Sequence, residues 1–355
     1  MRNFVSISPP MRVIFGSGTI KQLADEAKAL RIKRALVLST PEQAGQAQIA
    51  CEALQGRAAE TFSGAVMHTP VGVTDTAVGK AGIVNADGLV SLGGGSTIGL
   101  GKAIARRTGM PHISVPTTYA GSEMTPILGE TADGVKKTMR DAKILPNTVI
   151  YDVDLTFGLP PKISGVSGLN AIAHAVEALY ARDADPIVEL MAEEGIRALY
   201  TGLPGVISQP RDIDARANAL YGAWLCGTCL GRTSMALHHK LCHVLGGSFN
   251  LPHAETHAII LPHALAYNAP AVPEAIMRIK RAIGRDTPAT ALFELNAAFG
   301  APTALRDIGM PEDGIERALK LALNDPYWNP RPLGEDGLRK LLTNAWNGAR
   351  PSRAL

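Results

Sequence analysis

Four of the nine histidines in this 355-residue chain lie within residues 237–253. His239 and His243 are four residues apart, and the leucines and the valine around them have core-like spacing. That pattern predicts a helix, in which both rings project from one face. Gly246 and Gly247 are expected to end this helix. Imidazoles gathered in this way can transfer protons, bind anions or hold a metal ion.

Other polar residues are expected to join this group. Asn250 and Pro252 predict a turn that brings His253 back toward the first two histidines. Upstream, Asn170 and His174 are again four residues apart, in a segment that reads as a helix. A single such histidine is more often a core or capping residue than a ligand. Several polar side chains in apolar segments are costly to bury unless they are paired, so together they predict one functional pocket.

The composition excludes several classes of protein. With 46% hydrophobic and 19% charged residues, the chain is an ordinary globular protein long enough for two domains. The net charge of +3 and the lack of a basic run exclude a nucleic-acid partner. We find no apolar stretch of membrane-spanning length and no hydrophobic leader, so a cytoplasmic location is expected and no membrane partner.

The four cysteines are too few and too scattered for a disulfide framework. Cys226 and Cys229 have the spacing of a redox pair. They lie in a helix-like stretch without the βαβ context of such a pair, which favours a structural role.

Strand and helix patterns alternate over residues 12–118, which predicts a doubly wound, mostly parallel α/β domain. Strands are expected at 13–15, 34–40, 60–63, 88–92 and 112–116, and helices at 19–30, 41–55, 74–86 and 96–107. From about residue 158 we find only helical patterns separated by proline and glycine. The predicted domains are therefore an α/β domain at 1–157 and an all-α domain at 158–355, with the boundary at 158–161.

A glycine run, Gly93-Gly-Gly-Ser-Thr97, follows a predicted strand and precedes a predicted helix. Glycine lets the backbone approach a phosphate, and a helix N-terminus offers it free N–H groups. The run lacks the Gly-x-Gly-x-x-Gly spacing and has the alternative reading of a tight turn. The run stands between a strand and a helix, and hydroxyl-bearing residues follow the next strand, so it predicts a dinucleotide site. That site is expected to meet the histidines in a cleft between the two domains. The predicted cofactor contacts are Gly94, Gly95, Ser96, Thr117, Thr118 and Ser122.

Four motifs, in order across nearly the whole chain, resemble the iron-containing (group III) alcohol dehydrogenases. They are Gly94-Gly-Ser96, Pro116-Thr-Thr with Gly-Ser-Glu, the segment 168–177, and His239-x3-His243 with Pro-His253. Within that family the double histidine and Asn329-Pro-Arg-Pro are most similar to the maleylacetate reductases. The resemblance implies a dehydroquinate synthase-like architecture with a Rossmann-like first domain, a homodimer, and hydride transfer from NADH or NADPH.

The resemblance also places the family's metal ligands at Asn170, His174, His239 and His253. The family has an aspartate at the first position, and a neutral amide is a poorer ligand for a divalent cation. Our hypothesis is that the enzyme works without metal. Thr40 stands where many relatives carry a ribose-binding aspartate, which predicts use of NADPH alongside NADH.

A third departure is that the loop at residues 116–123 is one residue shorter than usual, so its phosphate contacts around residues 119–122 stay open. Family likeness places Lys143 near the nicotinamide ribose. A solvated lysine before a strand is the alternative.

The implied substrate, maleylacetate, is a dicarboxylate whose ketone is conjugated to a carbon–carbon double bond. Hydride addition to the alkene would give an enolate, which imidazoles can stabilise. His243 is the expected proton donor, and His239 and His253 are expected to contact the enolate or a carboxylate. The predicted substrate-site residues are His174, Asn170, His238, Lys240 and Arg331. For Lys240 and Arg331, solvated surface is the competing reading.

Two other functions fit the same residues. One is a metal-dependent alcohol or polyol dehydrogenase of the same family, in which Asn170 still coordinates. The other is a non-catalytic dinucleotide-binding sensor, against which the histidine cluster argues.

Overall fold

The first half of the chain folds around a parallel six-stranded sheet in the order β1-β8-β5-β4-β2-β3. The strands are β1 (Arg12–Gly16), β2 (Ala35–Leu38), β3 (Ala58–Phe62), β4 (Gly88–Gly93), β5 (His112–Pro116) and β8 (Thr148–Asp152). An antiparallel hairpin, β6 (Ile127–Ala132) and β7 (Val135–Arg140), stands apart from this sheet. This computed structural model describes residues 6, 11–132, 135–324 and 327–351. Contacts divide the chain into Ile7–Leu159 and a second unit of Pro160–Leu355 with the N-terminal residues to Ser6.

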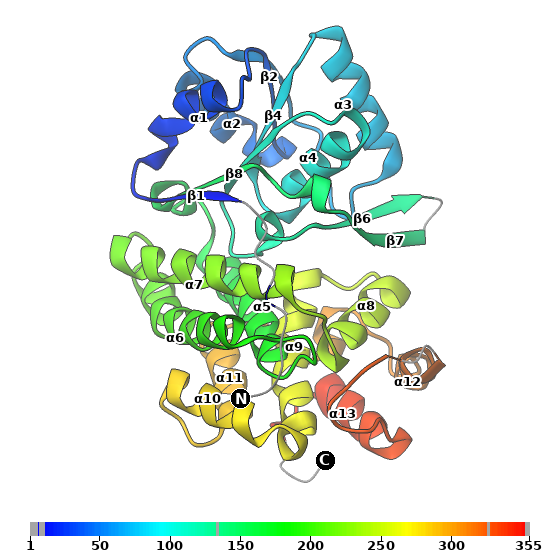
Figure 1. Cartoon of the computed structure of the whole chain (residues 1–355). Helices are drawn as coiled ribbons and strands as arrows, with labels where there is room; N and C mark the ends of the chain where they lie inside the picture. The colour runs from blue at the N-terminus through cyan, green and yellow to red at the C-terminus, as the bar shows by residue number, and fades with distance from the viewer. Residues whose placement is uncertain (1–5, 7–10, 133–134, 325–326, 352–355) are drawn as a thin grey trace. The chain divides into compact units, whose positions relative to one another are not determined.

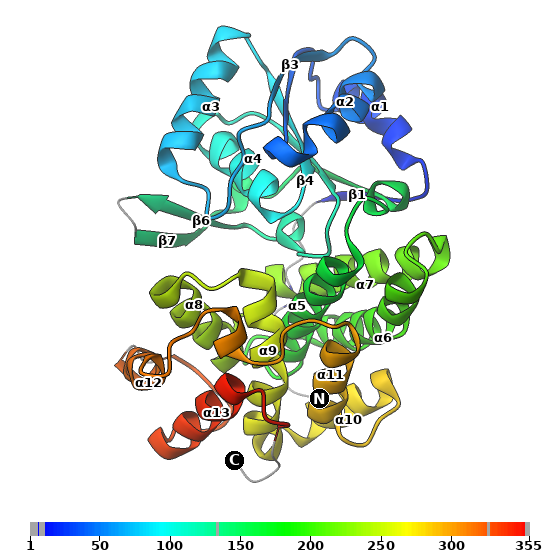
Figure 2. The ribbon, with the colours of Figure 1, turned by 180° about the vertical axis from the view of Figure 1, so that it is seen from behind.

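Helices cover both faces of the sheet, and alternate strand residues explain why (Figures 1 and 2). Val37 and Val90 pack in one core with α1 (Leu23–Ala29) and α2 (Ala44–Ala53). Their neighbours on the strands, including Leu36 and Leu89, pack in a second core with α3 (Val71–Ile83) and α4 (Gly95–Thr108). Successive strand side chains point to opposite faces, so strands with two buried faces are apolar throughout. The predicted doubly wound domain is confirmed.

The order of strands creates a switch point between β2 and β4. From β2 the chain moves outward to β3, and from β4 it moves the other way to β5 and β8. Ligands of open α/β sheets bind at such a point, beyond the carboxyl ends of the strands. In this unit Thr40 follows β2, the glycine run begins at the end of β4, and Thr117 follows β5.

The second unit is helical throughout its described residues, which confirms the predicted all-α part. Its helices are α5 (Pro161–Leu179), α6 (Pro186–Ser208), α7 (Ile213–Arg232), α8 (Leu237–Phe249), α9 (His253–Asn268), α10 (Pro273–Ile283), α11 (Pro288–Ala298), α12 (Gly314–Asn324) and α13 (Glu335–Asn347). Helix α5 is buried at every position from Ser164 to Leu179. A helix that is covered on all sides lies at the centre of its unit. Among the described residues, no helix is both long and apolar enough to cross a bilayer.

Helix α8 does not end at the two glycines. It passes through Gly246 and Gly247 to Phe249, so that prediction is wrong. The terminating residue is Asn250, whose φ of 51° lies in the left-handed region. Asparagine tolerates this conformation at a helix end, whereas glycines inside a helix cost only about 1 kcal/mol each.

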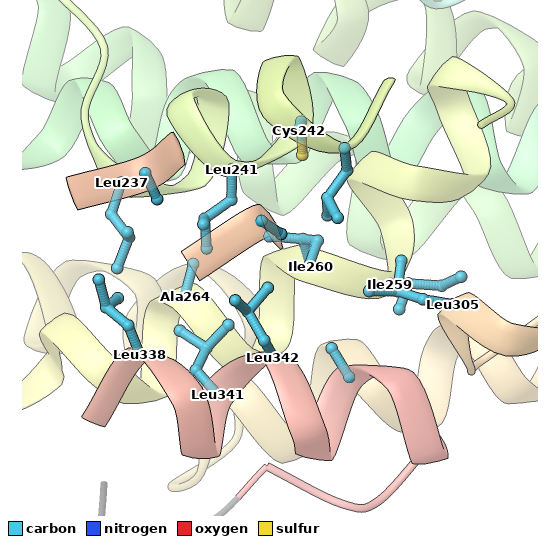
Figure 3. Packing of buried hydrophobic residues seen from close by; sticks show 14 of the residues in the cluster. Leu237, Leu241, Cys242, Ile259, Ile260, Ala264, Leu305, Leu338, Leu341 and Leu342 are labelled. Carbon is cyan, nitrogen blue, oxygen red and sulfur yellow. The ribbon is translucent and has the colours of Figure 1, made fainter. Parts of the chain in front are cut away.

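An apolar core below α8 and α9 fixes their positions (Figure 3). Leu237 and Leu241 from α8 meet Ile260 from α9 and Leu338 and Leu342 from α13, all of them fully buried. The opposite face of α8 is thereby free to present polar side chains to α5. The four cysteines are free, in agreement with the sequence prediction, and Cys226 and Cys229 are buried in α7.

Candidate active site

The polar face of α5 carries three buried side chains at helical spacing. Asn170, His174 and Glu177 lie at positions i, i+4 and i+7, which places them along one face. They are 3%, 3% and 0% exposed. Apart from Lys162 near its start, the helix is otherwise built from apolar and small residues, and His174 and Glu177 contact residues of α8.

Glu177 provides the cap that the sequence of α8 lacks. The N-cap position is Ala236, which has no side-chain acceptor, and the first turn contains no acidic residue. The carboxylate of Glu177 accepts hydrogen bonds from the backbone N–H groups of Ala236 (3.0 Å) and His238 (2.8 Å). It also accepts one from Nδ1 of His239 (2.7 Å). A carboxylate at this end satisfies the unpaired N–H groups and complements the helix dipole.

The same carboxylate fixes the orientation of the His239 ring. Nδ1–H of His239 donates to Glu177, so in the neutral ring Nε2 carries the lone pair. That Nε2 lies 2.9 Å from Nδ1 of His174. A hydrogen bond between them requires His174 to donate when His239 is neutral, and His239 to donate when it is protonated. Glu177, His239 and His174 therefore form a continuous chain along which a proton can be shared.

A second imidazole pair lies beside the first. Nε2 of His238 is 3.0 Å from Nδ1 of His257, and Sγ of Cys242 is 3.7 Å from the same His238 nitrogen. The pKa of His238 lies well below its ordinary value, mainly because the ring is buried and secondly because His239 is near. The pKa of His257 is also well below its ordinary value, mainly because of burial and secondly because of His253. Both rings are therefore neutral. The expected contact of His238 with a substrate carboxylate is disfavoured by this interior position.

Two exposed histidines complete the cluster. The ring of His243 lies 6.3 Å from that of His239, nearly perpendicular to it, and the ring of His253 lies 4.3 Å from that of His257. Both residues are solvent-exposed. The structure thus brings the predicted imidazoles together, with the buried rings held by protein partners and these two accessible.

Lys240 and Arg331 lie around Tyr327. The ammonium of Lys240 is 5.3 Å from the centre of the Tyr327 ring. Arg331 stacks on Tyr267 at 4.3 Å and donates through Nη1 to the Tyr267 carbonyl (2.7 Å). Tyr327 and Arg331 also line a cavity of about 300 Å³ together with Asn329. Arg331 is therefore positioned by the protein rather than free in solvent.

In the first unit, the glycine run forms a tight cradle at the start of α4. Gly93 has a φ of 152°, which few other residues adopt, and a Cβ on Gly94 would lie 2.9 Å from Cγ2 of Thr118. No side chain caps α4 at Gly94, so its first N–H groups face outward. The buried Oγ1 of Thr97 also has no hydrogen-bond partner. These features fit a dinucleotide phosphate, and the loop lies at the switch point of the sheet.

Some side chains around this cradle are hydrogen-bonded to other residues of the unit. The hydroxyl of Thr117 accepts from Nε2 of Gln43 (2.9 Å), and Ser122 Oγ lies 3.4 Å from Nζ of the buried Lys102. A backbone hydrogen bond and the hydroxyl of Thr40 lower the pKa of the exposed Glu42. A carboxylate therefore stands two residues beyond Thr40.

Three further predicted contacts belong to the first unit. Lys143 is exposed in a short 3-10 turn, Ala142–Ile144, that follows β7. Ser96 is half-buried in the first turn of α4, and Gly95 is a glycine whose Cβ would meet nothing. All three are compatible with a bound cofactor.

The family's metal positions do not form a ligand set for iron in this arrangement. The amide of Asn170 carries no charge, and its Oδ1 is buried without a partner. His174 and His239 direct ring nitrogens at each other. Among the described residues, His238, Cys242 and His257 are the only group whose donor atoms all lie within 4.8 Å of one another. His174, His239 and His253 are not that group, so in this arrangement they do not fit an iron ion.

Sequence reasoning missed Glu177 and His257. Both could have been found by continuing the helical spacing, because Glu177 follows His174 by three residues and His257 follows His253 by four. An acidic residue in an alanine-rich, buried helix was the available signal for the first.

Comparisons with known proteins agree with this fold. Residues 10–153 match the iron-containing alcohol dehydrogenase family, and residues 165–346 match the C-terminal part of the Fe-containing alcohol dehydrogenase family. A maleylacetate reductase from Sphingobium indicum is 55% identical over 99% of each chain. The crystal structure of maleylacetate reductase from Rhizobium sp. strain MTP-10005 is 53% identical, with a TM-score of 0.95 over 99% of this chain and 100% of that one. A structure from Ralstonia eutropha JMP134, described as an alcohol dehydrogenase, is 56% identical, with a TM-score of 0.98 and the same coverage.

Proposed function

The chain belongs to the iron-containing alcohol dehydrogenase family, and we propose that it reduces the carbon–carbon double bond of maleylacetate to give 3-oxoadipate. The relatives named maleylacetate reductase suggest the substrate. The observation that carries the proposal is the chain of buried groups from Glu177 through His239 to His174. Two of its members, His239 and His174, stand at metal positions that the family resemblance implies.

The reaction needs charge stabilisation on one oxygen and a proton on one carbon. A reduced nicotinamide supplies a hydride, and the alkene carbon remote from the ketone is the one that accepts it. The electron pair of the double bond moves so that the ketone becomes an enolate, and the neighbouring carbon then takes a proton. An enolate spreads its charge, so imidazole N–H donors are sufficient to stabilise it.

The histidines are suited to these tasks in different ways. His239 is held by Glu177 with a fixed tautomer, and its contact with His174 lets the pair share a proton. His243 and His253 are exposed at the edge of the cluster, where a substrate can reach them. We assign the proton to His243 and contact with the enolate or a carboxylate to His239 and His253.

The proposed cofactor is NADH or NADPH, held by the cradle of Gly94, Gly95 and Ser96 at the start of α4. Thr117, Thr118 and Ser122 would contact its phosphates and ribose. The outward N–H groups of α4 and the unpaired Oγ1 of Thr97 support this assignment.

NADH oxidation with maleylacetate, measured before and after exhaustive chelation, tests the proposal. We expect turnover that survives removal of metal to below one-tenth of an equivalent. Turnover of simple alcohols in place of maleylacetate, restored by iron or zinc, would instead identify a metal-dependent alcohol dehydrogenase. Light scattering on the purified protein tests the homodimer that the family implies.

A further inference from the structure

Three side chains of metal-binding types meet in the interior of the second unit, beside the family's metal positions: the ring of His257 lies 4.3 Å from that of His253 and 5.1 Å from that of His239. His238 and Cys242 are four residues apart on α8, and His257 comes from α9. They are 1%, 3% and 1% exposed. One donor atom from each lies within 4.8 Å of the other two.

Two of the three spacings between these atoms are close to the edges of a coordination tetrahedron. Zinc binds nitrogen at about 2.0–2.1 Å and thiolate sulfur at about 2.3 Å, which puts neighbouring ligand atoms roughly 3.3–3.7 Å apart. His238 Nε2 and Cys242 Sγ are separated by 3.7 Å, and His238 Nε2 and His257 Nδ1 by 3.0 Å. An ion can therefore be accommodated by small side-chain movements, with α8 and α9 unchanged.

The cluster is poorly satisfied by protein partners. Nδ1 of His238 and Nε2 of His257 are buried without hydrogen-bond partners. Since the two rings bond to each other through their remaining nitrogens, one donor and one acceptor stay unpaired whichever ring donates. Such groups are costly to bury, and an ion held by the two facing nitrogens would leave the outer nitrogens as N–H groups that need other partners. Cys242 also packs in the apolar core of α8, α9 and α13 (Figure 3), so the two imidazoles are the members of the cluster that apolar packing does not explain.

We propose that His238, Cys242 and His257 form a binding site for a borderline transition-metal ion such as Zn²⁺. Two imidazoles and a thiolate favour Zn²⁺ or Co²⁺ over Mg²⁺ and Ca²⁺, which prefer oxygen ligands. Binding releases the thiol proton to solvent and replaces the hydrogen bond between the imidazoles with two bonds to the ion. The fourth position is left for water. The site links α8 to α9 and lies outside the residues assigned to the reaction.

Cobalt binding to chelated protein tests this site directly, because cobalt bound to a thiolate has a charge-transfer band in the near ultraviolet. We expect this band to reach its full height at one equivalent of Co²⁺. Cys242→Ser should abolish it. Cys51→Ser, which changes a cysteine in the other unit, should leave it intact.

Two histidine variants separate this site from the family's metal positions. His257→Ala should abolish the band, whereas His253→Ala should retain it. The proposal is overturned if the band is missing in the wild type, persists in Cys242→Ser, or depends on His253 and not on His257. X-ray absorption of the zinc-loaded wild type gives an independent check, since a shell without sulfur would also overturn it.

Thermal unfolding provides a readout that does not depend on activity. Zn²⁺ binds only the folded site, so it should raise the unfolding midpoint of the wild type and not that of Cys242→Ser. An equal shift in both proteins would contradict the site. Since these tests do not measure reduction of maleylacetate, their failure would leave the proposed function unaffected.

Discussion

Replacing Glu177 by glutamine should damage both the stability of the second unit and its chemistry. The N–H donors to this side chain are the backbone at Ala236, His238 and His239 and Nδ1 of His239. A glutamine has a single acceptor oxygen, and its NH₂ group must face a donor. One buried N–H then loses its acceptor, which costs about 1–3 kcal/mol. The lost charge at the start of α8 adds about 0.5–1 kcal/mol.

The expected loss of unfolding free energy is therefore about 2–4 kcal/mol, measured by urea denaturation. Where the NH₂ group faces His239, it selects the tautomer with Nε2–H and breaks the defined proton chain. Loss of the correct tautomer in a carboxylate–imidazole pair lowers kcat by up to about 10⁴-fold, and we expect about 10²- to 10⁴-fold here. The KM for the nicotinamide cofactor should be unchanged, because the glycine cradle is untouched.

Glu316→Gln is a matched control. Glu316 is an exposed residue of α12 whose carboxylate pairs with Arg339 at 2.7 Å. A surface pair of this kind contributes less than about 1 kcal/mol. The reasoning about Glu177 is refuted if Glu177→Gln retains the wild-type kcat and the wild-type unfolding free energy, as the control should.

Four further predictions concern other parts of the chain. His243→Gln should lower kcat about 10²- to 10⁴-fold with little change in stability, because the side chain is exposed and acts as the proton donor; an unchanged kcat would exclude it. Gly94→Ala should raise the KM for NADH, since its Cβ would crowd Thr118 at 2.9 Å, and cofactor titration by fluorescence would show whether binding is spared. Arg331→Met should raise the KM for maleylacetate without affecting cofactor binding, and unaltered kinetics would make Arg331 a structural residue. Burial lowers the pKa of Lys102 to about 7, so between about pH 7 and 10 the unfolded chain binds a proton that the folded chain does not. Stability from this group therefore rises with pH in that window, by up to about 1.4 kcal/mol per unit, and urea denaturation of Lys102→Met should lack that rise.

The sheet was predictable where its strands are apolar on both faces. Leu36 to Leu38 and Leu89 to Leu92 are continuous buried runs with no other good interpretation. The strand β8, which lies between β1 and β5, was expected only as an unbounded strand after Lys143, because Thr148–Asp152 mixes polar and apolar residues in a short segment. Its burial comes from its neighbours in the sheet, which no local pattern records.

Local sequence patterns predicted which residues make up the candidate site, but not the hydrogen bonds between their side chains. Helical spacing placed His239 and His243 on one face and the turn returned His253. The end of α8 was misplaced because two glycines are a stronger local signal than Asn250, whose left-handed conformation depends on the chain that follows. The partners of each ring were beyond local reasoning, since the Glu177–His239 contact joins residues 62 positions apart.

That long separation also constrains the order in which the protein can fold. The first turn of α8 finds its acceptor only on α5, so a nascent α8 has frayed N-terminal amides until the two helices dock. Docking then completes the helix and orients the His239 ring in the same event. We expect the histidine cluster to assemble late in folding, and enzymatic activity to recover together with the tertiary contacts of α5 rather than with the earlier rise in helix content.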